Sequence, residues 1–286
     1  MQVIDQESER AIEKARVTLA KAERVLIGAG AGLSTAAGLT YSGGRFRRYF
    51  SSFIERYGMT DMYSAGFYPF PTDADRWAYW AHHAWVNCLG VGATSLYRQI
   101  FTWVQSRDYF VITTNVDKQF EKAGFESTRL FETQGDYAHI QCAQGCHSKI
   151  YENETVFRAI EEDTEWGKRT RVMDEFLLPR CPVCGGRMGM HLRCDNTFIQ
   201  TNAWYEAKAR YDAFVAEMLE KPTVLLELGV GWNTPVWIRM PFERLSVALD
   251  IPLVRMNFGE SYVDPSILKG VGVDGDIAQL LPRVLE

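Results

Sequence analysis

The chain has 286 residues, enough to bury a large core as one domain or two. Its 47% of hydrophobic and 23% of charged residues are typical of a soluble globular protein. A net charge of −5 without any long basic run argues against nucleic-acid binding. No apolar stretch reaches the roughly 20 residues of a membrane span, and the N-terminus lacks the features of a signal peptide. We therefore expect a cytoplasmic protein that binds neither membranes nor nucleic acid.

Strands alternate with helices along most of the chain. Apolar runs predict the strands, and apolar periodicity or turn residues predict the helices. The expected strands cover residues 25–27, 111–113, 129–132, 224–228 and 253–256. The expected helices cover residues 8–22 and 203–220, and others open at the glycine-rich turn 28–34, after Asp117, near Val236 and at Gly275. Strands that are apolar almost throughout indicate a parallel sheet covered by helices on both faces.

Two segments interrupt this alternation and predict a second, small domain. Residues 49–85 are dense in aromatic side chains and predict a mostly helical insertion, and residues 137–196 contain five of the six cysteines. We expect a packed helical core in the first segment, with an apolar channel for a long ligand as the alternative. The predicted domains are a Rossmann-like domain from residues 1–41, 90–136 and 197–286, and a small domain from the helical insertion 42–89 and a zinc-binding module 137–196.

The glycine-rich turn after the first strand is a candidate dinucleotide site. The backbone must approach a pyrophosphate without side chains in the way, and the start of a helix offers a positive dipole. Gly30, Gly32 and Ser34 directly after a buried strand satisfy both needs. The alternative is an ordinary tight connection between a strand and a helix.

The cysteines predict a structural zinc site. Cys142 and Cys146 form one close pair, and Cys181 and Cys184 form a second pair after 34 intervening residues. Structural zinc takes four tetrahedral ligands, often thiolates paired on short turns. His147 is a candidate substitute ligand, and four buried cysteines without metal are the alternative.

Polar residues and glycines follow several of the predicted strands. Asn115 and Asp117 come after the second strand, where ligands of open α/β sheets bind, and could contact a ribose or a carboxamide. Their alternative role is helix capping. Further turn residues adjoin later strand ends and would be ordinary turns by themselves: Gly229, Gly231, Asn257, Asp276 and Ile277.

In their order along the chain, these motifs resemble those of the sirtuin family. Residues 30–39 look like its NAD loop, residues 114–117 like its Gln-Asn-Ile-Asp motif, and residues 132–135 occupy the place of its Glu-x-His-Gly. The two cysteine pairs stand where its zinc module stands. The resemblance implies NAD contacts by Gly30, Ala31, Gly32, Ser34, Asn115, Asp117, Gln134, Gly229, Gly231, Asn257, Asp276 and Ile277, and structural zinc on Cys142, Cys146, Cys181 and Cys184.

The chain departs from the family pattern at three places. Gln134 replaces the catalytic histidine, and an amide can orient a hydroxyl but cannot remove its proton. Residues 190–196 differ from the segment that lines the acetyl-lysine tunnel in deacetylases, and His191 there could touch an acceptor. The usual Pro-Asp-Phe-Arg is absent, while Arg45 and Arg47 follow downstream, where they could contact a pyrophosphate or lie in a solvated loop.

This pattern is similar to that of the class M sirtuins of bacteria and fungi, which are linked to macrodomain proteins. These enzymes carry glutamine at this position and act as protein ADP-ribosyltransferases. The resemblance implies Asn115 and Gln134 as the catalytic pair, NAD as co-substrate and zinc as structural metal. It also implies an acceptor protein, in some bacteria a lipoylated carrier similar to the glycine-cleavage H protein, and an ADP-ribose-removing macrodomain protein as partners.

Three other functions stay open at this point. A lysine deacylase would need His139 or water in place of the missing base. A sensor of NAD or ADP-ribose would bind tightly without releasing nicotinamide, which the intact Asn115 and Asp117 argue against. A dehydrogenase lacks the acidic ribose partner that is expected about 20 positions after the glycine turn.

Overall fold

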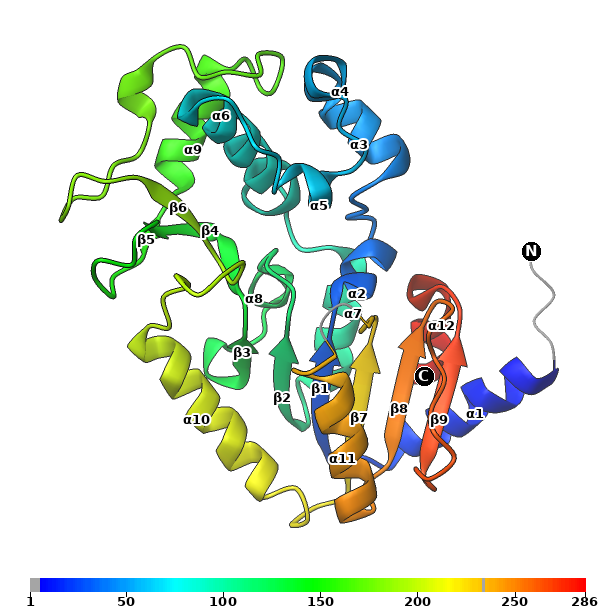
Figure 1. The fold of residues 1–286 in the computed structure, drawn as a ribbon. Helices are drawn as coiled ribbons and strands as arrows, with labels where there is room; N and C mark the ends of the chain where they lie inside the picture. Colours follow the sequence, from blue (N-terminus) through cyan, green and yellow to red (C-terminus); the bar gives the residue numbers. More distant parts are fainter. Residues whose placement is uncertain (1–5, 233–234) are drawn as a thin grey trace.

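The protein is described here by a computed structural model that covers residues 6–232 and 235–286. Residues 1–5 and 233–234, both within the predicted Rossmann-like domain, lie outside the described residues. Six parallel strands form the main sheet in the order β3-β2-β1-β7-β8-β9 (Figure 1). These strands are β1 (Arg24–Ala29), β2 (Asp108–Thr113), β3 (Leu130–Glu132), β7 (Thr223–Leu228), β8 (Leu253–Asn257) and β9 (Gly270–Asp274).

The strand order determines where a ligand can bind. The chain builds the sheet outward from β1 through β2 to β3, and then returns to the other side of β1 with β7 (Figure 1). The order therefore reverses between β1 and β7, and ligands of doubly wound sheets bind beyond the carboxyl ends of the strands at this point. The predicted Rossmann-like parallel sheet is confirmed.

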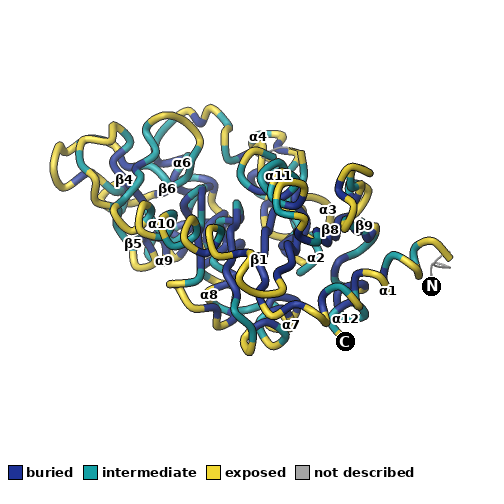
Figure 2. Tube along the Cα trace, turned by 90° about the horizontal axis from the view of Figure 1, so that it is seen from below, coloured by how far each residue is buried: buried dark blue, intermediate teal, exposed yellow. Residues whose placement is uncertain are grey.

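Helices cover both faces of the sheet and explain why most side chains of its strands are apolar. Val25 and Ile27 of β1 pack on one face, and Leu26 packs on the other. The first face is covered by α1 (Gln6–Ala20), α7 (Ser95–Val104) and α12 (Ile277–Leu285), and the second by α10 (Asn202–Ala216) and α11 (Arg239–Leu249). Figure 2 shows β1 in the dark blue of buried residues. None of the helices in the described part of the chain is long and apolar enough to cross a membrane.

Two short helices follow β1 and β2. They are α2 (Ala31–Ala36) and α8 (Gln119–Ala123). Strand β9 and helix α7 were not predicted, and α11 begins at Arg239 rather than near Val236. The sequence does not predict β9 because Gly270 and Gly272 occupy two of its five positions and glycine has a low strand propensity. Gly272 is nevertheless required, since a Cβ there would lie 2.2 Å from the Ser261 carbonyl oxygen.

The two insertions share one hydrophobic core, so they fold together as a small unit beside the main sheet (Figure 1). The core joins Phe50, Phe53 and Tyr79 of the first insertion to Ile140 and Phe157 of the second. The predicted helical packing is thus confirmed, while the residue boundaries of the two domains remain a prediction. The elements are α3 (Gly43–Tyr49), α4 (Ser51–Tyr57), α5 (Met62–Ala65), α6 (Asp73–Ala84), the π-helix η1 (Trp85–Leu89), α9 (Glu154–Asp163), and an antiparallel sheet β5-β4-β6 of β4 (Gly135–Cys142), β5 (Tyr151–Glu152) and β6 (Met188–Leu192).

A buried ion pair joins two strands of the main sheet. Glu227 of β7 lies opposite Arg255 of β8. Two hydrogen bonds of 2.6 and 2.9 Å link their side chains, which are 0% and 1% exposed. Burial raises the pKa of Glu227, and the hydrogen bonds from Arg255 oppose this shift. Arg255 also donates to Glu243, at 2.8 Å.

Replacing Arg255 with leucine should lower the free energy of unfolding by about 3–5 kcal/mol, because Glu227 would remain buried without its partner. Urea unfolding measures this loss. The control Lys208→Ala breaks an exposed pair with Asp212 and should change stability by less than about 0.5 kcal/mol. Equal effects of the two substitutions would contradict the assigned role of the buried pair.

Candidate active site

A buried polar network lies at the carboxyl ends of β1 and β2. The Asn115 amide donates to the Gly30 carbonyl oxygen at 3.0 Å, to Ser34 Oγ at 3.2 Å and to the Tyr97 hydroxyl at 3.0 Å. Ser34 Oγ donates to Asp117 Oδ2 at 2.5 Å. Three predicted site residues, Ser34, Asn115 and Asp117, therefore meet in one place. Tyr97 was not predicted, because it lies on the unpredicted helix α7.

The structure bears on the capping role that was the alternative for Asn115 and Asp117. The Asn115 amide is engaged by the glycine turn and does not cap a helix. Asp117 Oδ1 accepts from the Gln119 N–H at the start of α8, so this carboxylate has the capping role, and its contact with a ligand stays a prediction. Burial raises the pKa of Asp117, and the hydrogen bond from Ser34 opposes that shift.

The glycines of the turn allow two loops to touch. The Gly30 N–H donates to the Leu228 carbonyl oxygen at 3.0 Å, and the Gly32 N–H donates to the Gly229 carbonyl oxygen at 2.9 Å. A Cβ on Gly30 would lie 2.7 Å from Gly229 O, and a Cβ on Gly32 would lie 2.8 Å from Gly229 Cα. The turn after β1 thus packs backbone to backbone against the turn after β7, which brings three predicted glycines together.

The later motifs extend the site toward β8 and β9. Asn257 donates to the Val230 carbonyl oxygen at 3.1 Å, so it holds the turn after β7 from the opposite side. Asp276 accepts from the Ala278 N–H at 2.9 Å and caps α12. Ile277 is buried in the core of the main sheet. The structure thus gives Asp276 and Ile277 roles within the fold.

Gln134 lies in the short link between β3 and β4. The preceding Thr133 is buried and bonds to the Thr113 carbonyl oxygen of β2 through its N–H at 3.0 Å and its hydroxyl at 3.1 Å. The Gln134 carbonyl oxygen accepts from the Arg193 N–H at 3.0 Å. Within residues 6–232 and 235–286, the Gln134 side-chain amide has no hydrogen-bond partner. Its backbone is fixed while its amide is available to a ligand.

An unpredicted ion-pair network lies next to Gln134. His139 Nδ1 lies 2.7 Å from Asp136 Oδ1, and Lys118 Nζ lies 3.6 Å from Asp136 and 2.8 Å from Glu132. The hydrogen bond with Asp136 raises the pKa of His139. Burial raises the pKa of Glu132, and the Lys118 charge opposes it. In the sequence, only the separation of three residues between Asp136 and His139 indicates that these side chains could pair.

Of the other basic candidates, Arg45 and His191 have partners within the protein. Arg45 donates to Asn87 Oδ1 at 2.6 Å and to the Val86 carbonyl oxygen at 2.7 Å, so it joins α3 to the π-helix rather than lying in a solvated loop. Arg47 is exposed. His191 is buried, and its Nε2 lies 2.9 Å from the Ile199 carbonyl oxygen.

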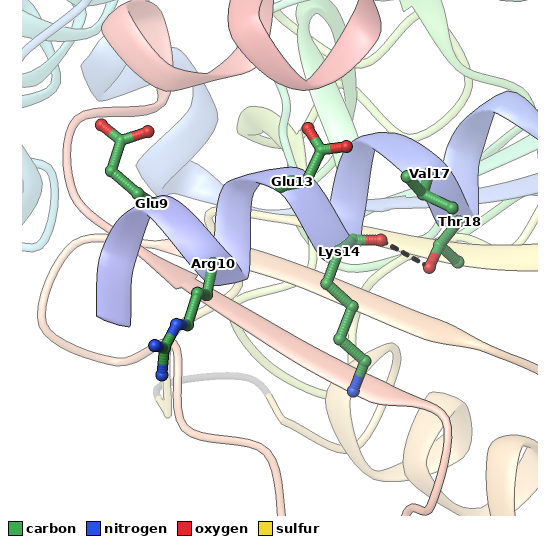
Figure 3. Close-up of a pocket in the computed structure, with 6 residues that line it drawn as sticks. All are labelled: Glu9, Arg10, Glu13, Lys14, Val17 and Thr18. Atoms are coloured by element: carbon green, nitrogen blue, oxygen red, sulfur yellow. Dashed lines mark hydrogen bonds between the residues drawn. The ribbon is translucent and has the colours of Figure 1, made fainter. Parts of the chain in front are cut away.

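A surface hollow on α1 is drawn in Figure 3. It is lined by Glu9, Arg10, Glu13, Lys14, Val17 and Thr18. Helix α1 packs against α12 and β9, at the opposite edge of the sheet from β3. None of the predicted site residues lines this hollow, so it is not a candidate active site.

The structure contains a cluster that could hold a metal ion at three of the four predicted cysteines. Cys142, Cys146, His147 and Cys181 bring one donor atom each within 4.8 Å of one another. Cys184 Sγ lies 3.8 Å from Cys142 Sγ, and the Sγ atoms of Cys146 and Cys181 lie 3.6 Å apart. Tetrahedral zinc with Zn–S bonds of about 2.3 Å separates its sulfurs by about 3.8 Å, so the thiolates fit this ion.

His147 is the fifth potential donor at this cluster. Its Nδ1 lies 3.0 Å from Cys146 Sγ and 3.8 Å from Cys181 Sγ, and its Nε2 lies 2.9 Å from the Tyr151 hydroxyl. The sequence prediction of four thiolates leaves this histidine beside the metal rather than on it.

The comparisons with known proteins agree with this architecture. The model of the Sir2 family matches residues 30–226, and the chain belongs to this family. A protein ADP-ribosyltransferase of Staphylococcus aureus is 30% identical over 247 residues, which cover 86% of this chain and 77% of that protein. A probable bifunctional ADP-ribose hydrolase/ADP-ribosyltransferase of Fusarium oxysporum is 33% identical over 95% of this chain. The matched region covers 47% of that relative, so this chain spans about half of its length.

More distant relatives share the fold. An NAD-dependent protein deacetylase of Xanthomonas campestris is 23% identical over 60% of this chain and 58% of that protein. The solved structure of a Sir2 homologue–NAD complex superposes with a TM-score of 0.59 at 15% identity, covering 96% of this chain and 92% of that chain. At this identity the match supports the fold alone.

Replacing Gly229 with alanine should lower the free energy of unfolding by at least about 3 kcal/mol, because its Cβ would lie 2.2 Å from the Leu33 nitrogen. The matched control is Gly58→Ala, which has a similar φ of +66° but open space around the Cβ. It should cost only the strain of a left-handed backbone, about 1–2 kcal/mol. Chemical unfolding compares the two, and equal losses would contradict the close contact of the two turns.

The purified protein should hold one zinc ion per chain by elemental analysis, in keeping with a single cluster. Cys181→Ser and Cys184→Ser should lose the metal and lower the Tm, since structural zinc contributes directly to folding. His147→Ala and the control Cys194→Ser should retain it. Retention by Cys184→Ser together with loss by His147→Ala would replace the four-thiolate assignment with three cysteines and a histidine.

Proposed function

We propose that this protein is an NAD-dependent protein mono-ADP-ribosyltransferase, which releases nicotinamide and transfers ADP-ribose to an acceptor protein. The observation that carries the proposal is Gln134, a non-titrating amide without a protein partner at the position where the sirtuin pattern has its catalytic histidine. The Staphylococcus aureus and Fusarium oxysporum relatives, both named as ADP-ribosyltransferases, support it.

Asn115 and Gln134 form the proposed catalytic pair. Asn115 Nδ2 is held by three protein oxygens, and no donor in the described residues reaches its Oδ1. This oxygen is therefore available to a ribose hydroxyl or to the nicotinamide carboxamide. The Gln134 amide can hold a ribose hydroxyl without removing its proton. A transferase needs no base that removes a ribose proton. Holding an acceptor nucleophile against the ribose carbon supplies a large part of the rate acceleration.

NAD is the proposed co-substrate, and the residues predicted from the motifs are its proposed contacts. Ser34, Asn115 and Asp117 gather at the carboxyl ends of β1 and β2, where a parallel sheet binds its ligand. The glycines after β1 and β7 and Asn257 lie around the adjoining turn. Zinc has a structural role away from this reaction, because its ligands belong to the small unit.

The proposed acceptor is a lipoylated carrier similar to the glycine-cleavage H protein. Its support is the resemblance to class M sirtuins. The proposed second partner is a macrodomain protein that removes ADP-ribose. The Fusarium oxysporum relative, whose name joins an ADP-ribose hydrolase to an ADP-ribosyltransferase, supports a functional link between the two activities.

Lysine deacylation is the weaker candidate. It needs a neutral base near the ribose, and His139 is the nearest histidine along the chain. Its hydrogen bond with Asp136 raises its pKa. A carboxylate–histidine pair of this kind can serve as a general base, so deacylation ranks second on the strength of Gln134 and of the two relatives named as ADP-ribosyltransferases.

Incubation with NAD and a lipoylated carrier protein should add one ADP-ribose to the carrier, as measured by intact mass. Asn115→Ala and Gln134→Ala should reduce the rate roughly 100-fold, because the ribose and nicotinamide lose their positioning contacts. The control Gln105→Ala, an exposed glutamine at the end of α7, should keep full activity. Removal of acetyl from an acetylated peptide, without any ADP-ribose on the carrier, would refute the proposal in favour of a deacylase.

A further inference from the structure

Arg193 lies against the two residues that precede β4. It directly follows β6, and its main-chain N–H donates to the Gln134 carbonyl oxygen at 3.0 Å. Its side-chain Nε–H donates to the Thr133 carbonyl oxygen at 3.2 Å. The guanidinium group is thus fixed beside the proposed catalytic glutamine by the fold itself.

Three aromatic rings surround the Arg193 guanidinium. The centre of the group lies 4.3 Å from the Phe198 ring, 5.5 Å from Trp204 and 5.5 Å from Trp237. These rings come from three segments: the loop after β6, the start of α10 and the chain before α11. Trp204 Nε1 also donates to the Thr133 carbonyl oxygen, at 3.3 Å, which fixes one wall. Such a box holds a cation in one orientation and shields it from water.

One nitrogen of this cation is buried without an acceptor. Arg193 Nη2 carries two N–H groups, and it has no hydrogen-bond partner within residues 6–232 and 235–286. Across the described ranges, no carboxylate forms an ion pair with Arg193, whereas the buried Arg24 and Arg255 each pair with two carboxylates. Arg193 as a whole is half-buried, but its Nη2 atom is buried, and buried polar atoms are almost always satisfied. An acceptor oxygen that belongs to a ligand would satisfy this group.

We infer that Arg193 is a substrate-recognition residue that binds an anionic oxygen beside Gln134. Two groups share this chemistry: a phosphate of the dinucleotide and a carboxylate of the acceptor. The identity of the ligand rests on the proposed function, while the unpaired donor and its box do not. No step of bond making is assigned to Arg193, because a guanidinium that stays protonated can position an anion but cannot transfer a proton.

Binding measurements on Arg193→Ala and Arg193→Lys test the inference. Calorimetry with ADP-ribose and with adenosine, which lacks phosphate, tests whether Arg193 binds a phosphate of the dinucleotide. Saturation-transfer NMR on acetate tests whether it binds a carboxylate. The acetate is added to protein saturated with ADP-ribose at constant ionic strength. The matched control is Arg107→Ala, which removes a guanidinium 4.4 Å from the Trp103 ring, just before β2 at the amino edge of the sheet.

If the anion is a phosphate, Arg193→Ala should weaken ADP-ribose binding roughly 10- to 100-fold and leave adenosine binding unchanged. If it is a carboxylate, ADP-ribose binding should stay within about two-fold and the acetate signal should disappear. Arg193→Lys keeps the charge and the fold, so in either case it should retain part of the binding. Arg107→Ala should resemble the unsubstituted protein in all arms.

Unchanged binding of both ADP-ribose and acetate in Arg193→Ala would overturn the inference. An equal loss of adenosine and ADP-ribose binding would also overturn it, because that pattern indicates a structural role. These measurements need no turnover. A protein that binds anions through Arg193 but modifies no acceptor would therefore refute the proposed function and leave this inference standing.

Discussion

The contact between the turn after β1 and the turn after β7 is the constraint on which the rest of the site depends. Gly32 donates to the Gly229 carbonyl oxygen, and neither residue has room for a Cβ. This contact brings the chain together at the point where the strand order reverses. Asn115 then binds the Gly30 carbonyl oxygen from β2. The place of the ligand thus follows from backbone packing before any side chain contributes to binding.

Around this fixed backbone, two of the titratable side chains already bind other groups of the protein. His139 is paired with Asp136, and Asp117 is engaged by Ser34 and the start of α8. Among the described residues, the groups without a protein partner include the side-chain amide of Gln134, Asn115 Oδ1, Arg193 Nη2 and His191 Nδ1. Gln134, Asn115 and Arg193 can orient a substrate, and none of these three can act as a general base at neutral pH. This combination suits transfer of a group to a nucleophile supplied by another protein.

The small unit contributes to the site through the strands on either side of its zinc cluster. Cys142 ends β4, and Cys181 precedes β6. These two strands are paired, and at their other end Gly135 lies opposite Leu192. The same pairing therefore places Gln134 next to Arg193. A metal that holds one end of this sheet together has a physical route to the geometry of the active site without contacting a substrate.

The sequence by itself determined the parallel sheet, the glycine turn, the cysteine pairs and the replacement of the expected histidine by Gln134. The first three depend on local composition and spacing, which a short window of sequence displays, and the replacement of the histidine follows from the resemblance to the sirtuin motifs. Only the tertiary structure decided the partners of Asn115 and the position of Arg193 among Phe198, Trp204 and Trp237. Asn115 and Gly30 are 85 residues apart in the chain, and the walls of the arginine box come from separate elements. No local pattern encodes such contacts, because they arise only when the strands have paired and the helices have packed.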